Sequence, residues 1–145
     1  MDSYTIALII HLFCAIIFIG FIFADVFVFP ALNKVFGDEQ AQKIKDTIYA
    51  RGVKIYPLSV LLLIASGGMM FSRYINSDLG YMNTNMQILL LIKVGLVLVI
   101  ALGIIYALFS RITKTQPASF MKYFHKTSFF LTLVIVLLAK LMFVM

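Results

Sequence analysis

Residues 9–32 read IIHLFCAIIFIGFIFADVFVFPAL, and this stretch decides the fold of the chain. It is long enough to cross a bilayer, because a membrane-spanning helix needs about 20 mostly apolar residues. It also contains His11, Cys14 and Asp25, which a simple membrane anchor would not require. Polar groups at such depth usually face other protein segments, so they are candidates for function.

His11 and Asp25 are predicted to lie on one side of this helix. They are fourteen positions apart in the sequence, and at 3.6 residues per turn that spacing returns them to nearly the same face. Their separation along the helix axis is about 21 Å, at 1.5 Å per residue. Phe18 lies between them on the same stripe. The pattern therefore predicts one polar group near each face of the membrane.

The composition indicates an integral membrane protein. The chain has 145 residues, of which 63% are hydrophobic and only 12% are charged. A soluble domain of this size could not bury so much apolar surface. We expect one transmembrane domain over residues 1–145. The first residues lack the positive segment of a secretory signal, so the first span is expected to stay in place.

Four apolar segments predict an all-α, four-helix membrane bundle. The expected spans cover about residues 4–33, 53–74, 85–110 and 118–143, with a short surface helix at about 39–50. Gly37 and Asp38 indicate a helix stop followed by an N-cap. Ser66, Gly67 and Gly68 are expected to face another helix, because small residues let helices approach closely.

The basic residues predict the orientation of the bundle. Nine of the twelve lysines and arginines flank the connections after the first and third spans: Lys34, Lys43, Lys45, Arg51, Lys54, Arg111, Lys114, Lys122 and Lys126. The opposite side has Arg73, Lys93 and Lys140. Since cytoplasmic loops are enriched in Lys and Arg, both termini are expected outside the cytoplasm. In a bacterium this describes a multi-pass inner-membrane protein, and the net charge of +6 is explained without a nucleic-acid partner.

One group of candidate metal ligands is expected near the outer face. It consists of His11, Cys14, Met69 and Met70. His11 and Cys14 are three residues apart, so both could contact one ion. Thiolate and thioether ligands favour Cu(I), and imidazole also suits copper. The alternative is structural: methionine fills irregular gaps in apolar cores, and Cys14 is then a small buried apolar residue.

His11 also suits an axial ligand of a b-type haem. His125 cannot be the second ligand of the same haem, because it enters from the opposite face, at a distance on the order of 20 Å along the membrane normal. Lys93 either extends its ammonium group to the outer interface or binds an anionic group such as a haem propionate. The sequence leaves copper, haem and a purely structural histidine open.

A second polar group is expected near the cytoplasmic face. It contains Asp25, Arg51, Lys54 and His125. Asp25 needs a partner at this depth, and a basic residue of the second or fourth span would form an ion pair with it. A proton relay between Asp25 and His125 is the alternative, because histidine titrates near neutral pH.

The first span resembles that of the copper-resistance D (CopD) family of small bacterial membrane proteins. The resemblance is carried by His11-Leu12, Gly20 and the sequence FPAL at residues 29–32, and it extends to Leu91-Ile92-Lys93. The chain is also similar to the haem-biosynthesis J (HemJ) family, which implies a protoporphyrinogen oxidase. That resemblance implies functional roles for His11, Lys93 and Lys140.

The sequence thus predicts an inner-membrane protein that handles copper or binds haem b at an outer site built on His11. Two alternatives remain: a haem-dependent enzyme similar to protoporphyrinogen oxidase, and a structural or assembly subunit of a larger membrane complex. The expected partners are membrane lipid and a copper ion or haem. The sequence leaves open whether the protein forms a homo-oligomer.

Overall fold

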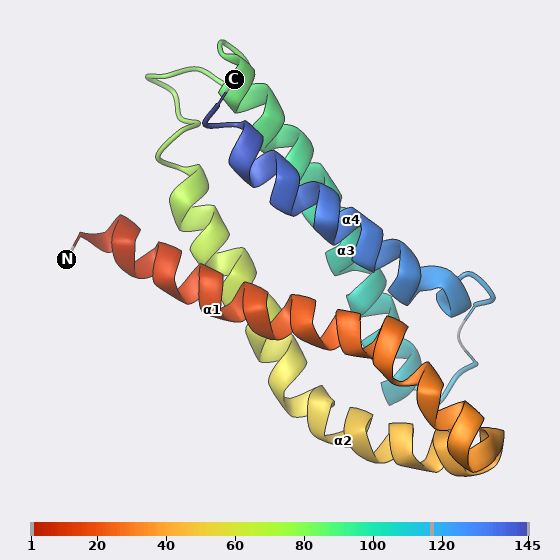
Figure 1. Cartoon of the computed structure of the whole chain (residues 1–145). Helices are drawn as coiled ribbons and strands as arrows, with labels where there is room; N and C mark the ends of the chain where they lie inside the picture. The colour runs from red at the N-terminus through yellow and green to blue at the C-terminus, as the bar shows by residue number, and fades with distance from the viewer. Residues whose placement is uncertain (1, 117, 145) are drawn as a thin grey trace. The chain divides into compact units, whose positions relative to one another are not determined.

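The computed structural model describes residues 2–116 and 118–144, and all its regular elements are helices, with no strand in these ranges. The elements are α1 (Ser3–Phe23), the π-helix η1 (Ala24–Val28), α2 (Pro30–Phe71), α3 (Asn85–Ile112) and α4 (Met121–Leu141) (Figure 1). The all-α prediction is confirmed.

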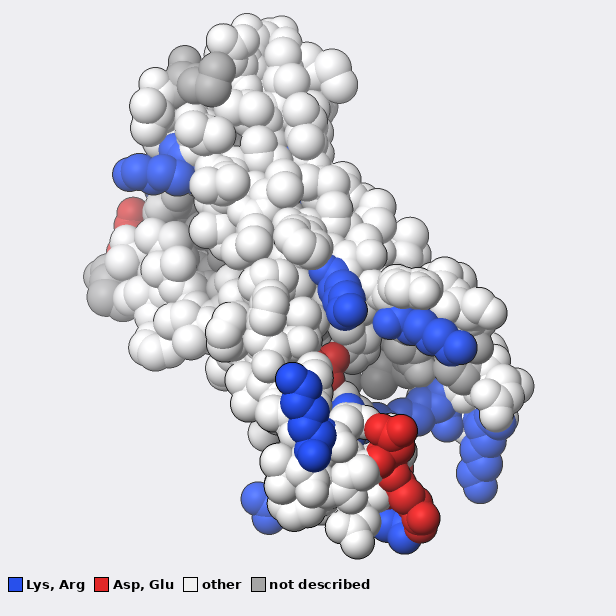
Figure 2. All heavy atoms as spheres, turned by 45° about the vertical axis from the view of Figure 1, so that its right-hand side comes forward, with Lys and Arg blue, Asp and Glu red and all other residues white. Residues whose placement is uncertain are grey.

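The described chain contains four helical segments long and apolar enough to cross a membrane. They are Ser3–Val28, Pro30–Phe71, Asn85–Ile112 and Met121–Leu141. Figure 2 shows a wide surface without charged side chains, as contact with lipid requires. The chain is therefore a multi-pass membrane protein, and the placement of its termini outside stays a prediction.

The helix expected over residues 4–33 consists of three parts. After α1 the backbone continues as the π-helix η1, where the N–H of Phe29 donates to the carbonyl of Ala24, five residues back, at 2.8 Å. Pro30 follows and has no N–H to donate, and α2 starts there. The sequence places Pro30 correctly near the end of the span, but it does not reveal the π-helix.

The surface helix expected at 39–50 and the second span form one element, α2. The early part of α2 is kinked at Gly37, whose φ of 75° favours glycine. Side-chain hydrogen bonds stabilise this turn: Asn33 Nδ2 donates to Asp38 Oδ1 at 2.8 Å, and Lys45 Nζ donates to Asn33 Oδ1 at 2.7 Å. The chain reverses direction here, so that α2 runs back past α1 (Figure 1).

The structure divides into two compact units, Met1–Met70 and Phe71–Met145, and each is described by itself. In the first unit α1 crosses α2 (Figure 1). The buried residues of α1 are Ala7, Cys14, Phe18 and Ile22. Their spacing of four or seven residues places them on one helix face. This is the stripe that the sequence predicts to face protein.

In the second unit α3 and α4 lie side by side (Figure 1). They approach closely at Gly103, where a Cβ atom would overlap the ring of Phe124. The same face of α4 buries Ser128 and Thr132. Glycine at position 103 is therefore required by packing, not by backbone conformation.

The connection between α2 and α3 is organised by Gln87. Its side-chain amide donates to the carbonyls of Tyr74 at 3.0 Å and Gly80 at 3.1 Å, and its Oε1 accepts from the N–H of Asn83 at 2.8 Å. Gln87 also completes a capping box with Thr84 at the start of α3. A small apolar cluster of Ile75, Leu90 and Met142 lies in the same unit.

We expect Gly103→Ala to destabilise the second unit by about 1–3 kcal/mol, the usual range for overpacking. The control is Gly95→Ala in the same helix, where a Cβ atom meets nothing within 4 Å in the described structure. That change should be neutral or stabilising by up to about 1 kcal/mol, because alanine favours helix more than glycine. Thermal unfolding of the purified protein in detergent measures both. Equal unfolding temperatures for the two variants would contradict the contact.

Candidate functional site

The first candidate site is centred on His11 of α1. The Nδ1 atom of His11 lies 3.1 Å from the carbonyl oxygen of Leu63 and 3.0 Å from Oγ of Ser66, both on α2. The imidazole is half-buried, and Ser66 is buried. Two membrane-spanning helices therefore hold the ring through one of its nitrogens.

These contacts assign the tautomer of His11. A carbonyl oxygen such as that of Leu63 can only accept a hydrogen bond. The hydroxyl of Ser66 donates to the carbonyl of Leu62 at 2.6 Å, so its oxygen is left to accept from the histidine. Nδ1 therefore carries the proton, and in the neutral ring the lone pair lies on Nε2. Fixing Nδ1–H on a carbonyl is how proteins commonly orient a metal-binding histidine.

Gly67 makes room for this ring. A Cβ atom at position 67 would lie 3.3 Å from Cε1 of His11 and 3.6 Å from its Nδ1. Gly68 is different: it is exposed, and within the first unit a Cβ atom there meets nothing within 4 Å. Within the first unit, Ser66 and Gly67 therefore face α1 as expected, and Gly68 faces no helix of that unit.

The other candidate metal ligands have different environments. Cys14 is buried at 6% exposure, Met70 is half-buried, and the side chain of Met69 is 58% exposed. In residues 2–116 and 118–144, no three side chains of His, Cys, Asp or Glu come together as a metal site. Lys93 is half-buried in α3 and belongs to the second unit. His11 is thus the candidate whose orientation the structure defines.

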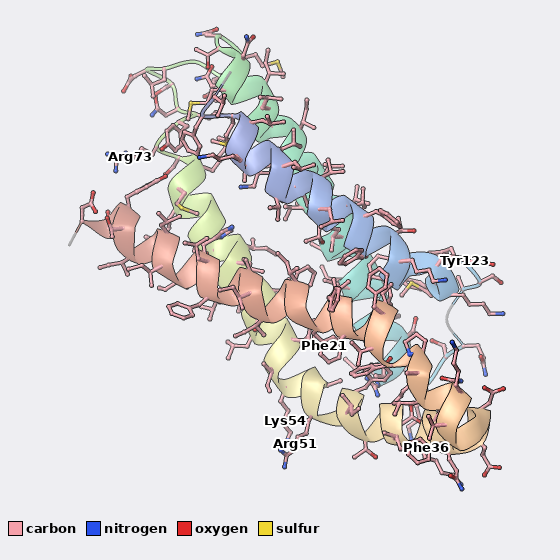
Figure 3. The ribbon with its side chains drawn as sticks, in the orientation of Figure 1. Phe21, Phe36, Arg51, Lys54, Arg73 and Tyr123 are labelled. Atoms are coloured by element: carbon pink, nitrogen blue, oxygen red, sulfur yellow. The ribbon has the colours of Figure 1, made fainter. Side chains whose placement is uncertain are left out.

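The second candidate site is centred on Asp25, in the π-helix η1. The hydroxyl of Tyr49, on α2, donates to Oδ1 of Asp25. The basic residues expected beside Asp25 are Arg51 and Lys54. Both are exposed, and Figure 3 shows them projecting from the side of α2 that faces away from α1. His125 is an exposed residue of α4, in the second unit.

Sequence reasoning missed Tyr49, because the segment around it is polar and suggests a surface helix. One feature of the sequence indicates this partner: the phenol hydroxyl of Tyr49 lies about one helical turn before the apolar part of α2 begins. A tyrosine at a membrane interface presents an apolar ring and a polar tip. Such a residue is a natural partner for a carboxylate at the same depth.

Aromatic rings surround the hydrogen bond between Asp25 and Tyr49. The ring of Phe21 lies 4.2 Å from that of Tyr56 and 6.1 Å from those of Tyr49 and Phe29, between ring centroids. Figure 3 shows Phe21 on α1 directed toward α2. The rings cover the polar pair with apolar surface.

The π-helix explains how Phe21 and Phe29 both reach Tyr49. In a regular α-helix, residues eight apart point about 80° away from each other, at 100° per residue. The wider π turn takes up one extra residue, which returns Phe29 to the face of Phe21. Both rings then pack near Tyr49, at 6.1 and 6.4 Å between centroids.

Comparison with known proteins finds no match: no protein-family model, no curated protein and no solved structure matches the chain. The resemblance to the CopD and HemJ families therefore stays a prediction.

Gly67→Leu should displace the His11 ring and reduce the yield of folded protein, whereas Gly68→Leu should be tolerated. The two positions are adjacent in one helix, so a difference between them reports the contact with His11 rather than helix propensity. Size-exclusion chromatography and thermal unfolding in detergent measure both effects. If Gly68→Leu were the more damaging change, the packing of α1 on α2 would be contradicted.

Asp25→Ala should destabilise the protein by about 1–3 kcal/mol, the cost of removing the acceptor of a half-buried hydroxyl. The control is Asp38→Ala. Asp38 also accepts a hydrogen bond, from Asn33, but it is exposed, so its loss should cost less than about 1 kcal/mol. Thermal unfolding of both variants in detergent measures these two losses of stability. Equal stabilities would show that the hydrogen bond between Tyr49 and Asp25 does not stabilise the fold.

Proposed function

We propose that this protein binds a b-type haem through Nε2 of His11. The supporting observation is the anchoring of Nδ1 by the Leu63 carbonyl and Ser66. It orients the ring from the side opposite Nε2 and keeps the lone pair on Nε2 in the neutral tautomer. Imidazole in this form is the usual protein ligand of haem iron.

The residues around His11 offer one imidazole ligand that α2 holds in place. Gly67 lets the ring pack against this helix. Bound haem would supply one-electron redox chemistry, and the protein would supply the ligand and an apolar surrounding. Lys93 belongs to the second unit, and the proposal does not depend on it.

Copper handling is the second candidate, and Cys14 favours it. The thiol is buried, and it follows His11 by about one helical turn on the same buried face. Thiolate and imidazole together suit copper. The exposure of Met69 favours haem over copper. A copper site needs several soft ligands close together, and the side chain of Met69 is largely exposed.

The proposed site faces the outer side of the inner membrane of a bacterial cell. This orientation follows from the nine basic residues beside the first and third connections, against three on the other side. His11 lies early in the first span and therefore near the outer face. A site there would exchange its cofactor or electrons with the periplasmic side.

His11→Ala should abolish cofactor binding, and His125→Ala should leave it intact. His125 is exposed in the second unit, so it controls for the general effect of removing an imidazole. The absorption spectrum of purified protein detects haem through its Soret band, and elemental analysis detects copper. Full occupancy in His11→Ala would overturn the site, and loss confined to His125→Ala would move it to the second unit.

Ser66→Ala tests the same site with a smaller change than His11→Ala. It keeps His11 and the Leu63 carbonyl but removes one of the two acceptors of Nδ1–H. Loss of such a supporting contact commonly weakens binding by about 10–100-fold. A haem titration should therefore give weaker binding in Ser66→Ala and none in His11→Ala. Unchanged affinity in Ser66→Ala would contradict a role for the anchor.

A further inference from the structure

One exposed face of α2 joins two basic side chains to a strip of apolar side chains. We call it the basic-apolar face, and it consists of six exposed residues: Arg51, Lys54, Ile55, Leu58, Leu62 and Ala65. Counted from the first, the others follow at three, four, seven, eleven and fourteen positions, which are intervals that return to one side of an α-helix. Figure 3 shows Arg51 and Lys54 directed away from α1. Because α2 is long and apolar enough to cross a membrane, this face is directed at lipid.

The two cations of the basic-apolar face have no partner in the part of the chain that the structure describes. Lys43 and Lys45, in the same unit, each donate to a neighbouring side chain, at 2.8 and 2.7 Å between the two atoms. Arg51 and Lys54 form no hydrogen bond or ion pair with any described residue. The sequence from residue 47 to residue 77 contains no Asp or Glu that would neutralise them. Both cations are therefore available to an anion from outside the chain.

The apolar part of the face has the length of one membrane leaflet. Ile55 and Ala65 are ten residues apart, which corresponds to about 15 Å along the helix axis, at 1.5 Å per residue. The hydrocarbon core of a bilayer is about 30 Å thick, so one leaflet contributes about half of that thickness. A lipid whose headgroup lies at Arg51 and Lys54 can therefore extend an acyl chain along the whole apolar strip.

The pair of cations favours a phosphate group without a cationic group beside it. Residues three apart on a helix are neighbours, so Arg51 and Lys54 can approach the same phosphate. A guanidinium group forms two parallel hydrogen bonds to phosphate oxygens, and lysine adds a point charge. The cationic group of a zwitterionic headgroup is repelled by both side chains, whereas phosphatidylglycerol carries the phosphate charge alone. The apolar strip favours a lipid over a soluble anion, which would leave Ile55 and Leu58 without a contact.

We propose that the basic-apolar face of α2 binds an anionic phospholipid. The phosphate group accepts hydrogen bonds from Arg51 and Lys54, and one acyl chain packs along the apolar residues of the face. The lipid supplies the negative charge that the chain itself does not place there. Ser66 and Gly67, which contact His11, lie on another side of α2. The lipid site is therefore separate from the site proposed for a cofactor.

A single tryptophan can report which lipid contacts this face. The chain has no tryptophan, so Leu58→Trp introduces the only one, at a position where the side chain is 57% exposed. The complete protein is reconstituted in phosphatidylcholine bilayers that contain a fixed minor fraction of a lipid with brominated acyl chains, which quench tryptophan on contact. Brominated phosphatidylglycerol should quench more than the same fraction of brominated phosphatidylcholine. Each cation near an anionic headgroup contributes about a 5-fold preference, so we expect a relative affinity of about 5–30-fold.

Two charge-matched double variants locate this preference. Added to Leu58→Trp, the pair Arg51→Gln and Lys54→Gln should reduce the relative affinity to about 1-fold, the value without these charges. The pair Arg111→Gln and Lys114→Gln also removes two exposed charges three residues apart, but Lys114 lies beyond the end of α3. That pair should leave quenching at position 58 unchanged. Equal quenching by the two lipids in Leu58→Trp alone, or a preference that survives the loss of Arg51 and Lys54, would overturn the proposal.

Two further measurements distinguish a bound lipid from a general attraction of anions. Ile105→Trp places the only tryptophan at an exposed position of α3, where both brominated lipids should quench equally; the same preference there would overturn a site on α2. Inorganic phosphate added at constant ionic strength should leave the quenching unchanged, and displacement of the lipid by phosphate would overturn lipid as the ligand. The comparison of two lipids does not depend on cofactor occupancy, so its outcome is separate from that of the test at His11.

Discussion

The first unit depends on one constraint: a polar side chain inside a membrane span must find a partner in the protein, because hydrocarbon offers none. α1 contains His11 and Asp25, and α2 provides a partner for each. His11 contacts the Leu63 carbonyl and Ser66, and Asp25 accepts from Tyr49. The two helices are therefore linked by hydrogen bonds near both ends of the span, with apolar contacts between them.

These two links differ in chemical character. At His11, a carbonyl and a serine oxygen both accept from the same nitrogen, which fixes one tautomer and one ring orientation. At Asp25, a carboxyl oxygen accepts from the phenol hydroxyl of Tyr49, and aromatic rings of both helices pack nearby. One helix hairpin thus contains two polar contacts of different kinds.

The second unit is stabilised in another way. Gly103 admits the ring of Phe124, and Gln87 satisfies several backbone groups of the preceding connection. Within α4, Thr132 donates to the carbonyl of Ser128, and Met142 lies in the apolar cluster with Ile75 and Leu90. At this position the gap-filling role of methionine is what the structure shows. In the second unit, the contacts described here pack α3 against α4 and hold the connection between α2 and α3.

The sequence by itself determined the all-α class, the four apolar helices and the buried stripe of α1, because hydrophobic length and a period of 3.6 residues are local properties of a chain. It also singled out His11 and Asp25, since polar residues in an apolar span are visible without a structure. The tertiary structure decided their partners. Periodicity predicts which face a residue occupies but not what packs against that face, so the hydrogen bond of Tyr49 to Asp25, the contact of Gly67 with the His11 ring and the π-helix at Asp25 all depend on how α2 meets α1.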